Sequence, residues 1–211
     1  MQIAIALFDR FTALDAVGPY EVLGRVPGAE TVFVAERPGP VRNDSGTLAL
    51  VADATFAEVT RPDVVVVPGG PGQTPQMANE TLLSWLRAVD ATTTWTASVC
   101  TGSLLLAAAG LLKGRRATSH WLALNAIKRY DVEPTGERVV FDGKYVTAAG
   151  VSSGIDMALA LAGRIAGDRA AQSIQLLTEY DPQPPYDAGS PHKAPADLVA
   201  EHRAHSRHPQ P

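Results

Sequence analysis

The sequence of 211 residues contains a single cysteine, Cys100. One cysteine cannot form a disulfide within the chain, so we expect an ordinary hydrophobic core to hold the fold. No apolar run reaches the roughly 18 residues that a membrane-spanning helix needs. The N-terminus, MQIAIALFDR, also lacks the basic start and long apolar stretch of a signal peptide. These absences favour a cytoplasmic protein with no membrane partner.

Excess charge of one sign is also missing. The chain carries 18 basic and 22 acidic residues, for a net charge of −4, and no stretch is strongly basic. Nucleic-acid phosphates are bound by clustered lysine and arginine, so we expect no nucleic-acid partner. Hydrophobic residues make up 45% of the chain, which is ordinary for a globular protein, and the length suits one α/β domain.

Short apolar segments alternate with segments of helical periodicity. We expect strands over 3–7, 30–35, 48–51, 63–67 and 95–99, and a hairpin over 139–141 and 145–147. We expect helices over 15–23 (shortened or kinked at its start by Gly18-Pro19), 79–90, 101–112, 118–129 after an initial turn, 152–166 and 169–178. This alternation predicts an α/β fold with a mostly parallel sheet and helices on both faces.

The composition changes near residue 181. Seven of the 16 prolines and four of the five histidines lie in 181–211. We therefore predict a single α/β domain over 1–180 and a Pro/His-rich C-terminal arm or tail over 181–211. Such a segment often packs on a partner subunit or is partly disordered. His202, His205 and His208 recur every three residues, but no cysteine joins them, and we expect no metal site.

Cys100 lies where the expected strand 95–99 meets the expected helix. A side chain at such a junction projects at the carboxyl end of the sheet, where open α/β folds bind ligands. Backbone N–H groups at a helix N-terminus also lower the pKa of a thiol. Alternatively, a lone cysteine can pack in the core as a small hydrophobic residue. The junction and the small residues around it favour a nucleophile.

A glycine-rich segment, Pro68-Gly69-Gly70-Pro71-Gly72, follows another buried strand. Glycine frees backbone N–H groups to face a developing negative charge. The alternative is a turn that merely requires glycine. The segment matches neither the Rossmann nor the P-loop spacing, so we do not expect a nucleotide.

Asp15 and His120 are the candidate proton carriers. Asp15 follows the first strand, so in a parallel sheet it projects at the same edge as Cys100 and could exchange protons with it. A helix N-cap is the alternative for Asp15, and Glu21 is the competing carboxylate. His120, the only histidine before the tail, could pair with the thiol or could be a capping or core residue.

These segments together resemble the ThiJ/PfpI superfamily. The matching stretches are LDAVGPYEVL, VVPGGPG, SVCTGSLLLAAAGLL, ATSHW, VTAAGVSSGIDMAL and EYDPQPPYDAGSPHKA, spread over nearly the whole chain. The resemblance implies a flavodoxin-like three-layer sandwich, related to class I glutamine amidotransferases, with its cysteine on a nucleophile elbow. Within the superfamily the chain is most similar to the isonitrile hydratase branch.

That resemblance implies roles for single residues. Cys100 would be the nucleophile, Asp15 the acid/base, and Thr101 a polar group shaping the site. Gly70, with Gly69, would supply backbone N–H groups to the reacting centre, and His120 would lie at the substrate. Thr101 stands where peptidase-like members have histidine, so a protease-type Cys–His pair is not expected.

The activity implied is hydration of an isonitrile to an N-substituted formamide by a lyase that needs no cofactor and works as a homodimer. The alternatives are another cofactor-free enzyme of glyoxalase or amidase type, and a non-catalytic sensor whose cysteine is oxidised or binds a regulator. Related domains occur in AraC-type regulators, but we find no room for a helix-turn-helix domain after residue 181.

Overall fold

The structure is a computed structural model that describes residues 1–208, and its centre is a seven-stranded sheet of order β10-β11-β7-β6-β1-β2-β5. The strands are β1 (Gln2–Ala6), β2 (Glu30–Ala35), β5 (Ala54–Thr55), β6 (Val64–Val67), β7 (Trp95–Val99), β10 (Val139–Asp142) and β11 (Tyr145–Ala148). All neighbouring strands pair in parallel except β10 and β11, which form the expected antiparallel hairpin.

Three adjacent strands, β1, β6 and β7, form the middle of this sheet. All four residues of β6 are fully buried valines, because helices cover the sheet on both sides. Val65 is paired with Ala4 of β1 and with Thr96 of β7, so the three strands run in the same direction. Their carboxyl ends therefore lie at one edge of the sheet, side by side.

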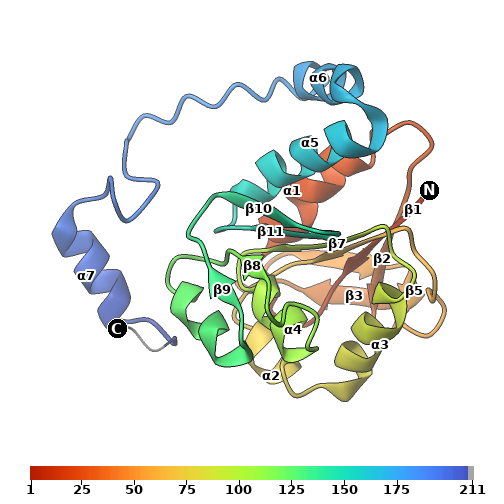
Figure 1. Ribbon diagram of the computed structural model, residues 1–211, viewed down its shortest axis with the longest axis horizontal. Coiled ribbons are helices and arrows are strands. Elements are labelled where there is room, and N and C mark those ends of the chain that lie inside the picture. Colours follow the sequence, from red (N-terminus) through yellow and green to blue (C-terminus); the bar gives the residue numbers. More distant parts are fainter. Residues whose placement is uncertain (209–211) are drawn as a thin grey trace.

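Helices cover both faces of the sheet (Figure 1). One face carries α1 (Ala13–Leu23), α5 (Ser153–Ala166) and α6 (Asp168–Leu177), and the other carries α2 (Gln73–Gln76), α3 (Glu80–Asp90), α4 (Gly102–Ala108) and the 3₁₀ helix η1 (Leu124–Tyr130). This is the flavodoxin-like three-layer sandwich that the sequence predicts.

Two small sheets complete the domain. They are β3 (Gly39–Arg42) with β4 (Ala49–Ala52), and β8 (Arg116–Ala117) with β9 (Glu133–Pro134). Pro40 belongs to β3, which the sequence does not predict. β3 pairs with β4 alone, and a two-stranded pair tolerates the missing N–H of proline.

Three helices differ from the prediction, and one of them, expected over 118–129 after an initial turn, is the 3₁₀ helix η1, which begins only at Leu124. α1 begins at Ala13, two residues earlier than expected, and contains Pro19 in its interior. α4 ends at Ala108 instead of residue 112, and Gly110 (φ +84°) then adopts a left-handed conformation that stops a helix.

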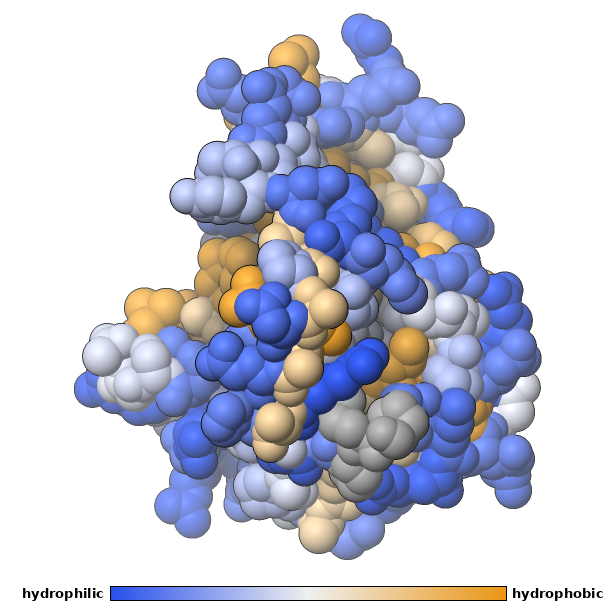
Figure 2. Space-filling model, turned by 90° about the vertical axis from the view of Figure 1, so that its left-hand side faces the viewer, coloured by the Kyte–Doolittle hydropathy of each residue, from blue (hydrophilic) through white to orange (hydrophobic). Residues whose placement is uncertain are grey.

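The C-terminal segment holds a helix that the sequence analysis did not predict, α7 (Ala196–Ala204). Residues 181–195 leave α6 without regular structure and bring α7 to the side of the domain (Figure 1). None of its residues is buried, and the His202 ring meets the Trp121 ring edge-on at 6.5 Å. The side of the molecule shown in Figure 2 is mainly hydrophilic, with small apolar areas between polar side chains.

Within residues 1–208 we find no helix with the length and apolar character to cross a membrane.

Candidate active site

Five of the six predicted site residues meet where β1, β6 and β7 end. Asp15 comes from the first turn of α1, Gly69 and Gly70 follow β6, and Cys100 and Thr101 follow β7. Contacts between these three segments are direct, because Gly69 and Gly70 bond to Asp15 and Thr101. The parallel sheet thus joins residues that are far apart in the chain.

Cys100 occupies a sharp turn between β7 and α4. Its φ is +59°, a left-handed conformation that is uncommon for a residue other than glycine and typical of a nucleophile elbow. The Cys100 N–H donates to the Ala149 carbonyl at 2.8 Å. The hydroxyls of Ser103 and Ser119 donate to the Cys100 carbonyl at 3.3 and 3.1 Å. These bonds fix the elbow from both sides.

Two glycines allow the elbow to pack against the end of β6. A Cβ at Gly102 would lie 2.1 Å from the Val67 carbonyl oxygen, and a Cβ at Gly69 would lie 2.5 Å from the Thr101 nitrogen. Both contacts are with backbone atoms that cannot move aside. The close approach of the two turns therefore depends on the absence of side chains at these positions.

Asp15 is completely buried beside Cys100 and does not cap its helix. Its Oδ2 atom accepts a hydrogen bond from the Gly69 N–H at 2.9 Å. Its Oδ1 atom has no hydrogen-bond partner at ordinary distance among residues 1–208, and the carboxyl interacts with the Cys100 thiol. Burial raises the pKa of Asp15 from 3.8 to about 7, although the Gly69 N–H and the Cys100 thiol oppose that rise.

The Cys100 thiol is protonated at rest. Burial raises its pKa, and the negative charge of Asp15 raises it further. The N–H groups of Val151 and Thr101 lower it, but by less. The backbone donors thus act in the expected direction, but burial and the neighbouring carboxylate outweigh them, so the net pKa of the thiol is raised.

The glycine N–H groups that we expected at the reacting centre have partners within the protein. The Gly69 N–H donates to Asp15, and the Gly70 N–H donates to Thr101 Oγ1 at 3.0 Å. Gly70 has φ +126°, and a Cβ there would lie 2.4 Å from the Thr12 nitrogen. In this structure the two glycines hold the acid and the threonine in place. Their action on a substrate stays a prediction.

His120 lines the same cavity as Cys100, which has a volume of about 330 Å³. Its ring packs on Gly150, where a Cβ would lie 2.9 Å from the ring, and its Nδ1 accepts from the Leu122 N–H at 3.3 Å. Burial lowers the pKa of His120, and the charges of Arg207 and His202 lower it further. Its imidazole is therefore neutral near pH 7.

Glu21, the alternative to Asp15 as the carboxylate near Cys100, lies elsewhere. It is exposed and forms an ion pair with Arg25 at 2.7 Å, one helical turn away. It does not line the Cys100 cavity. Asp15 is thus the carboxyl group that the fold brings to the thiol.

The sequence analysis missed two contributors to the site. Val151 donates its N–H toward Cys100, and its only sequence signal is its place in the VTAAGVSSGIDMAL stretch. Residues 205–208 of the C-terminal segment line the cavity as well. Nothing in their composition indicates this, because they reach the site only through the path of the chain after α6.

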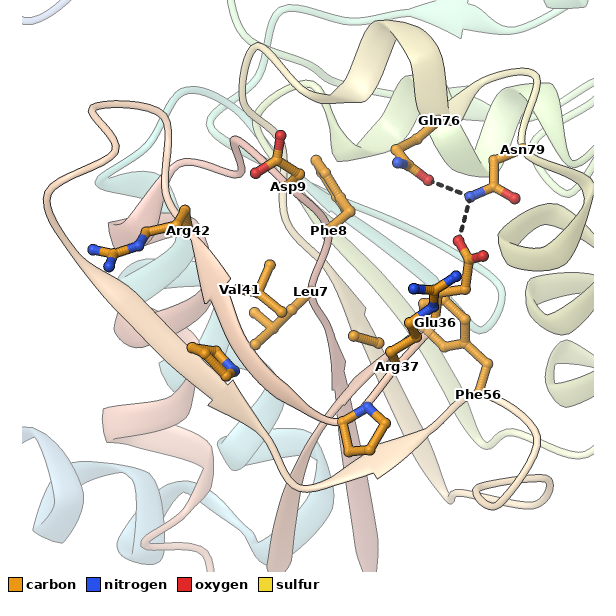
Figure 3. A pocket seen from close by; sticks show the side chains of 13 residues that line it. Leu7, Phe8, Asp9, Glu36, Arg37, Val41, Arg42, Phe56, Gln76 and Asn79 are labelled. Atoms are coloured by element: carbon orange, nitrogen blue, oxygen red, sulfur yellow. Dashed lines mark hydrogen bonds between the residues drawn. The ribbon is translucent and has the colours of Figure 1, made fainter.

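A second cavity, of about 500 Å³, lies beyond the ends of β1 and β2, beside the β3–β4 hairpin (Figure 3). Asn79 spans one side of it and donates to Gln76 at 2.8 Å and to Glu36 at 3.3 Å. It contains no cysteine and is separate from the Cys100 cavity. In the part of the chain that the structure describes, no cluster of His, Cys, Asp or Glu is arranged to hold a metal ion.

Comparison with known proteins identifies the family of this chain. The model of the DJ-1/PfpI family matches residues 1–164. An isonitrile hydratase of Pseudomonas putida is 42% identical over 203 residues, which cover 96% of this chain and 89% of that protein. The HTH-type transcriptional regulator CdhR of Pseudomonas aeruginosa is 30% identical over 171 residues, but these cover 74% of this chain and only 50% of the regulator.

A solved structure extends the likeness to the whole fold. The crystal structure of a ThiJ/PfpI family protein from Pseudomonas syringae superposes with a TM-score of 0.93 at 38% identity. The match covers 96% of this chain and 84% of that one. The matched region therefore includes most of the C-terminal segment as well as the α/β domain.

Proposed function

The chain belongs to the DJ-1/PfpI family, and we propose that within it the protein is an isonitrile hydratase, a lyase that converts an isonitrile and water to an N-substituted formamide. The observation that carries the proposal is the buried Asp15 carboxyl beside the Cys100 thiol. The likeness to the Pseudomonas putida enzyme over nearly the whole chain supports the choice of substrate.

The first step requires a nucleophile and a proton for the same carbon. The terminal carbon of R–N≡C accepts the sulfur electron pair and must also gain a proton to become a formyl C–H. Asp15, as carboxylate, takes the Cys100 thiol proton while the sulfur attacks, and then delivers it to that carbon. The product is a covalent thioimidate, S–CH=N–R, and Asp15 is again a carboxylate.

The second step hydrolyses this intermediate. Asp15 removes a proton from water as the water oxygen attacks the thioimidate carbon, and that proton goes to the nitrogen. The C–S bond then breaks as the hydroxyl of the tetrahedral intermediate becomes the formyl C=O. The hydroxyl proton passes through Asp15 to the sulfur, which restores the thiol, and the formamide R–NH–CHO leaves. One molecule of water is consumed, no electrons are exchanged, and neither a metal ion nor a redox cofactor takes part.

The pKa values of Asp15 and Cys100 suit these two reaction steps. A carboxyl group with a pKa of about 7 is partly ionised at neutral pH and exchanges protons readily in either direction. The raised pKa of Cys100 keeps the proton on sulfur until Asp15 removes it. The N–H groups of Val151 and Thr101 stabilise negative charge on the sulfur when the C–S bond breaks.

The same features weigh against the rival functions. A cysteine that senses oxidants reacts as an exposed thiolate, whereas Cys100 is buried and its pKa is raised. A protease-type pair would need a basic histidine at the thiol, and Thr101 occupies the position after the cysteine. Glyoxalase and amidase chemistry on the same residues is separated from hydration by substrate profiling.

The assay mixes the purified protein with cyclohexyl isocyanide and follows N-cyclohexylformamide by chromatography, with methylglyoxal and a simple amide as competing substrates. We expect the formamide from the wild type and at least about a hundredfold less from Asp15→Asn, since proton transfer contributes at least that factor. Turnover of methylglyoxal or the amide without formamide would move the assignment to one of the rival enzymes.

We also propose that the protein acts in the cytoplasm as a homodimer.

A further inference from the structure

The end of the C-terminal segment lies over the Cys100 cavity. His205, Ser206, Arg207 and His208 line it together with Cys100 and His120. The helix before them, α7, lies against Trp121, with the Arg203 guanidinium 6.0 Å from the centre of that ring. A segment about 100 residues after the nucleophile therefore supplies side chains to the substrate cavity.

Arg207 is the charged residue of this group, and no carboxylate among residues 1–208 forms an ion pair with it. Its Nε donates to His208 Nε2 at 3.3 Å. The carboxylate whose charge reaches it, Asp44, already accepts hydrogen bonds from Thr12, Asn43 and Ser45 at 2.9, 3.1 and 2.9 Å. Among residues 1–208, the other N–H groups of the guanidinium have no acceptor at hydrogen-bond distance.

Arg207 is the permanently charged side chain among the residues that line this cavity. Burial lowers the pKa of Arg207, the Cys100 and Asp44 charges raise it, and Arg10 lowers it. Burial and Arg207 lower the pKa of His208 to about 4, so this imidazole is neutral near pH 7. Burial, Arg207 and His202 lower the pKa of His120, so it is neutral as well. Arg207 therefore supplies the positive charge of the cavity lining.

We propose that Arg207 is a specificity residue that binds a carboxylate on the substrate, so that the preferred substrates are isonitriles carrying an anionic group. A guanidinium presents paired N–H donors that match a carboxylate, and it gains most from such a partner when it is partly withdrawn from water. The cavity of about 330 Å³ accommodates a small isonitrile between Arg207 and Cys100. This inference rests on the proposed hydratase function.

The kinetic test compares potassium isocyanoacetate with its methyl ester, which differ in charge and little in size. We expect the wild type to have a kcat/KM for the anion about fivefold or more above that for the ester, mainly through a lower KM. In Arg207→Gln we expect kcat/KM for the anion to fall about fivefold more than kcat/KM for the ester, so that the ratio of the two approaches one. Arg207→Lys retains part of the preference, and added salt reduces it.

A second test does not depend on hydration. Iodoacetate and iodoacetamide alkylate the Cys100 thiol and differ in the same charge, so the ratio of their rates reports attraction of the anion to the cavity. We expect Arg207→Gln to lower the ratio of iodoacetate to iodoacetamide about fivefold. The matched control, Arg169→Gln on α6, removes an equal charge from an exposed position and should leave the ratio unchanged.

The two tests separate the two claims. Loss of the alkylation ratio in Arg207→Gln, in a protein that hydrates no isonitrile, would sink the hydratase function and keep Arg207 as the anion-binding group. Hydration of cyclohexyl isocyanide with equal ratios in wild type and Arg207→Gln would keep the hydratase and overturn the role of Arg207. A ratio that falls equally in Arg169→Gln would show an effect of net charge alone and would also overturn it.

Discussion

Asp15 and Cys100 are two acids whose protons depend on each other. The carboxyl is buried without a cationic partner, and its pKa rises to about 7, while its own charge helps to keep the thiol protonated. The pair therefore holds two protons at low pH and one proton above neutrality. The form with one proton, a thiol beside a carboxylate, is the reactive one in the proposed mechanism.

The first prediction concerns the pH dependence of activity. Because the carboxylate form of Asp15 takes the thiol proton, kcat/KM for cyclohexyl isocyanide should rise with pH through an apparent pKa of about 7 and then level off. Initial rates between pH 5 and pH 9 check this. A rate that is highest at pH 5 and falls through neutrality would mean that the protonated carboxyl is the active form.

The second prediction concerns stability. The pKa of Asp15 is higher in the folded protein than its ordinary value of 3.8, so the folded state binds more protons between these values and loses stability as the pH rises through this window. The contribution is fully present below pH 4 and gone above pH 7, and it amounts to at most about 4 kcal/mol. Urea unfolding of wild type and Asp15→Asn at several pH values isolates it. If the free energy of unfolding changed with pH in the same way in both proteins, the raised pKa of the buried Asp15 carboxyl would be contradicted.

Single residues also show where sequence reasoning succeeds. Asp15 and Cys100 were predicted to meet because both follow parallel strands, and parallel strands end at one edge. The net shift of the thiol pKa does not follow from the sequence, since it depends on how completely the site is buried. Partners such as Val151 and Arg207 depend on loop paths, which periodicity does not encode.

At the scale of elements, the elbow depends on the contact between the turn after β6 and the start of α4. Gly102→Ala would place a Cβ 2.1 Å from the Val67 carbonyl and 2.8 Å from the Pro68 carbonyl. We expect a loss of roughly 3 kcal/mol in the free energy of unfolding, because backbone on both sides must shift. Urea unfolding measures it. Gly189→Ala, which meets nothing within 4 Å, is the control and should change little. If Gly102→Ala were as stable as the wild type, the close packing of the elbow would not require glycine at this position.

Elements with strong local signals were predicted well. The run Asp63 to Val67 indicated a strand buried on both faces, and β6 is one. The Asp142-Gly143 turn predicted the β10–β11 hairpin, where Gly143 has φ +60°. The helix α7 was missed because no buried face gives it a periodic pattern, and its place is set by contact with Trp121.

For the whole molecule, α6 and the segment after it leave apolar side chains in water. Leu176 and Leu177 are 82% and 73% exposed, and Tyr186 is 81% exposed. Exposed large apolar side chains of this kind suit an interface. We expect a homodimer of about twice 22.2 kDa in sedimentation velocity at micromolar concentration. Leu176→Gln with Leu177→Gln should shift the protein toward monomer. A wild type that sediments only as a monomer would contradict the dimer.

Cys100 forms, in the proposed mechanism, the covalent bond through which an isonitrile is hydrated. Its role is tested by the rate of N-cyclohexylformamide formation by Cys100→Ala beside the wild type, with the fold of both checked by circular dichroism. We expect steady product from the wild type and a rate at least about a thousandfold lower from the folded variant, since the nucleophile takes part in both steps. Formamide produced by folded Cys100→Ala at a rate near that of the wild type would contradict it.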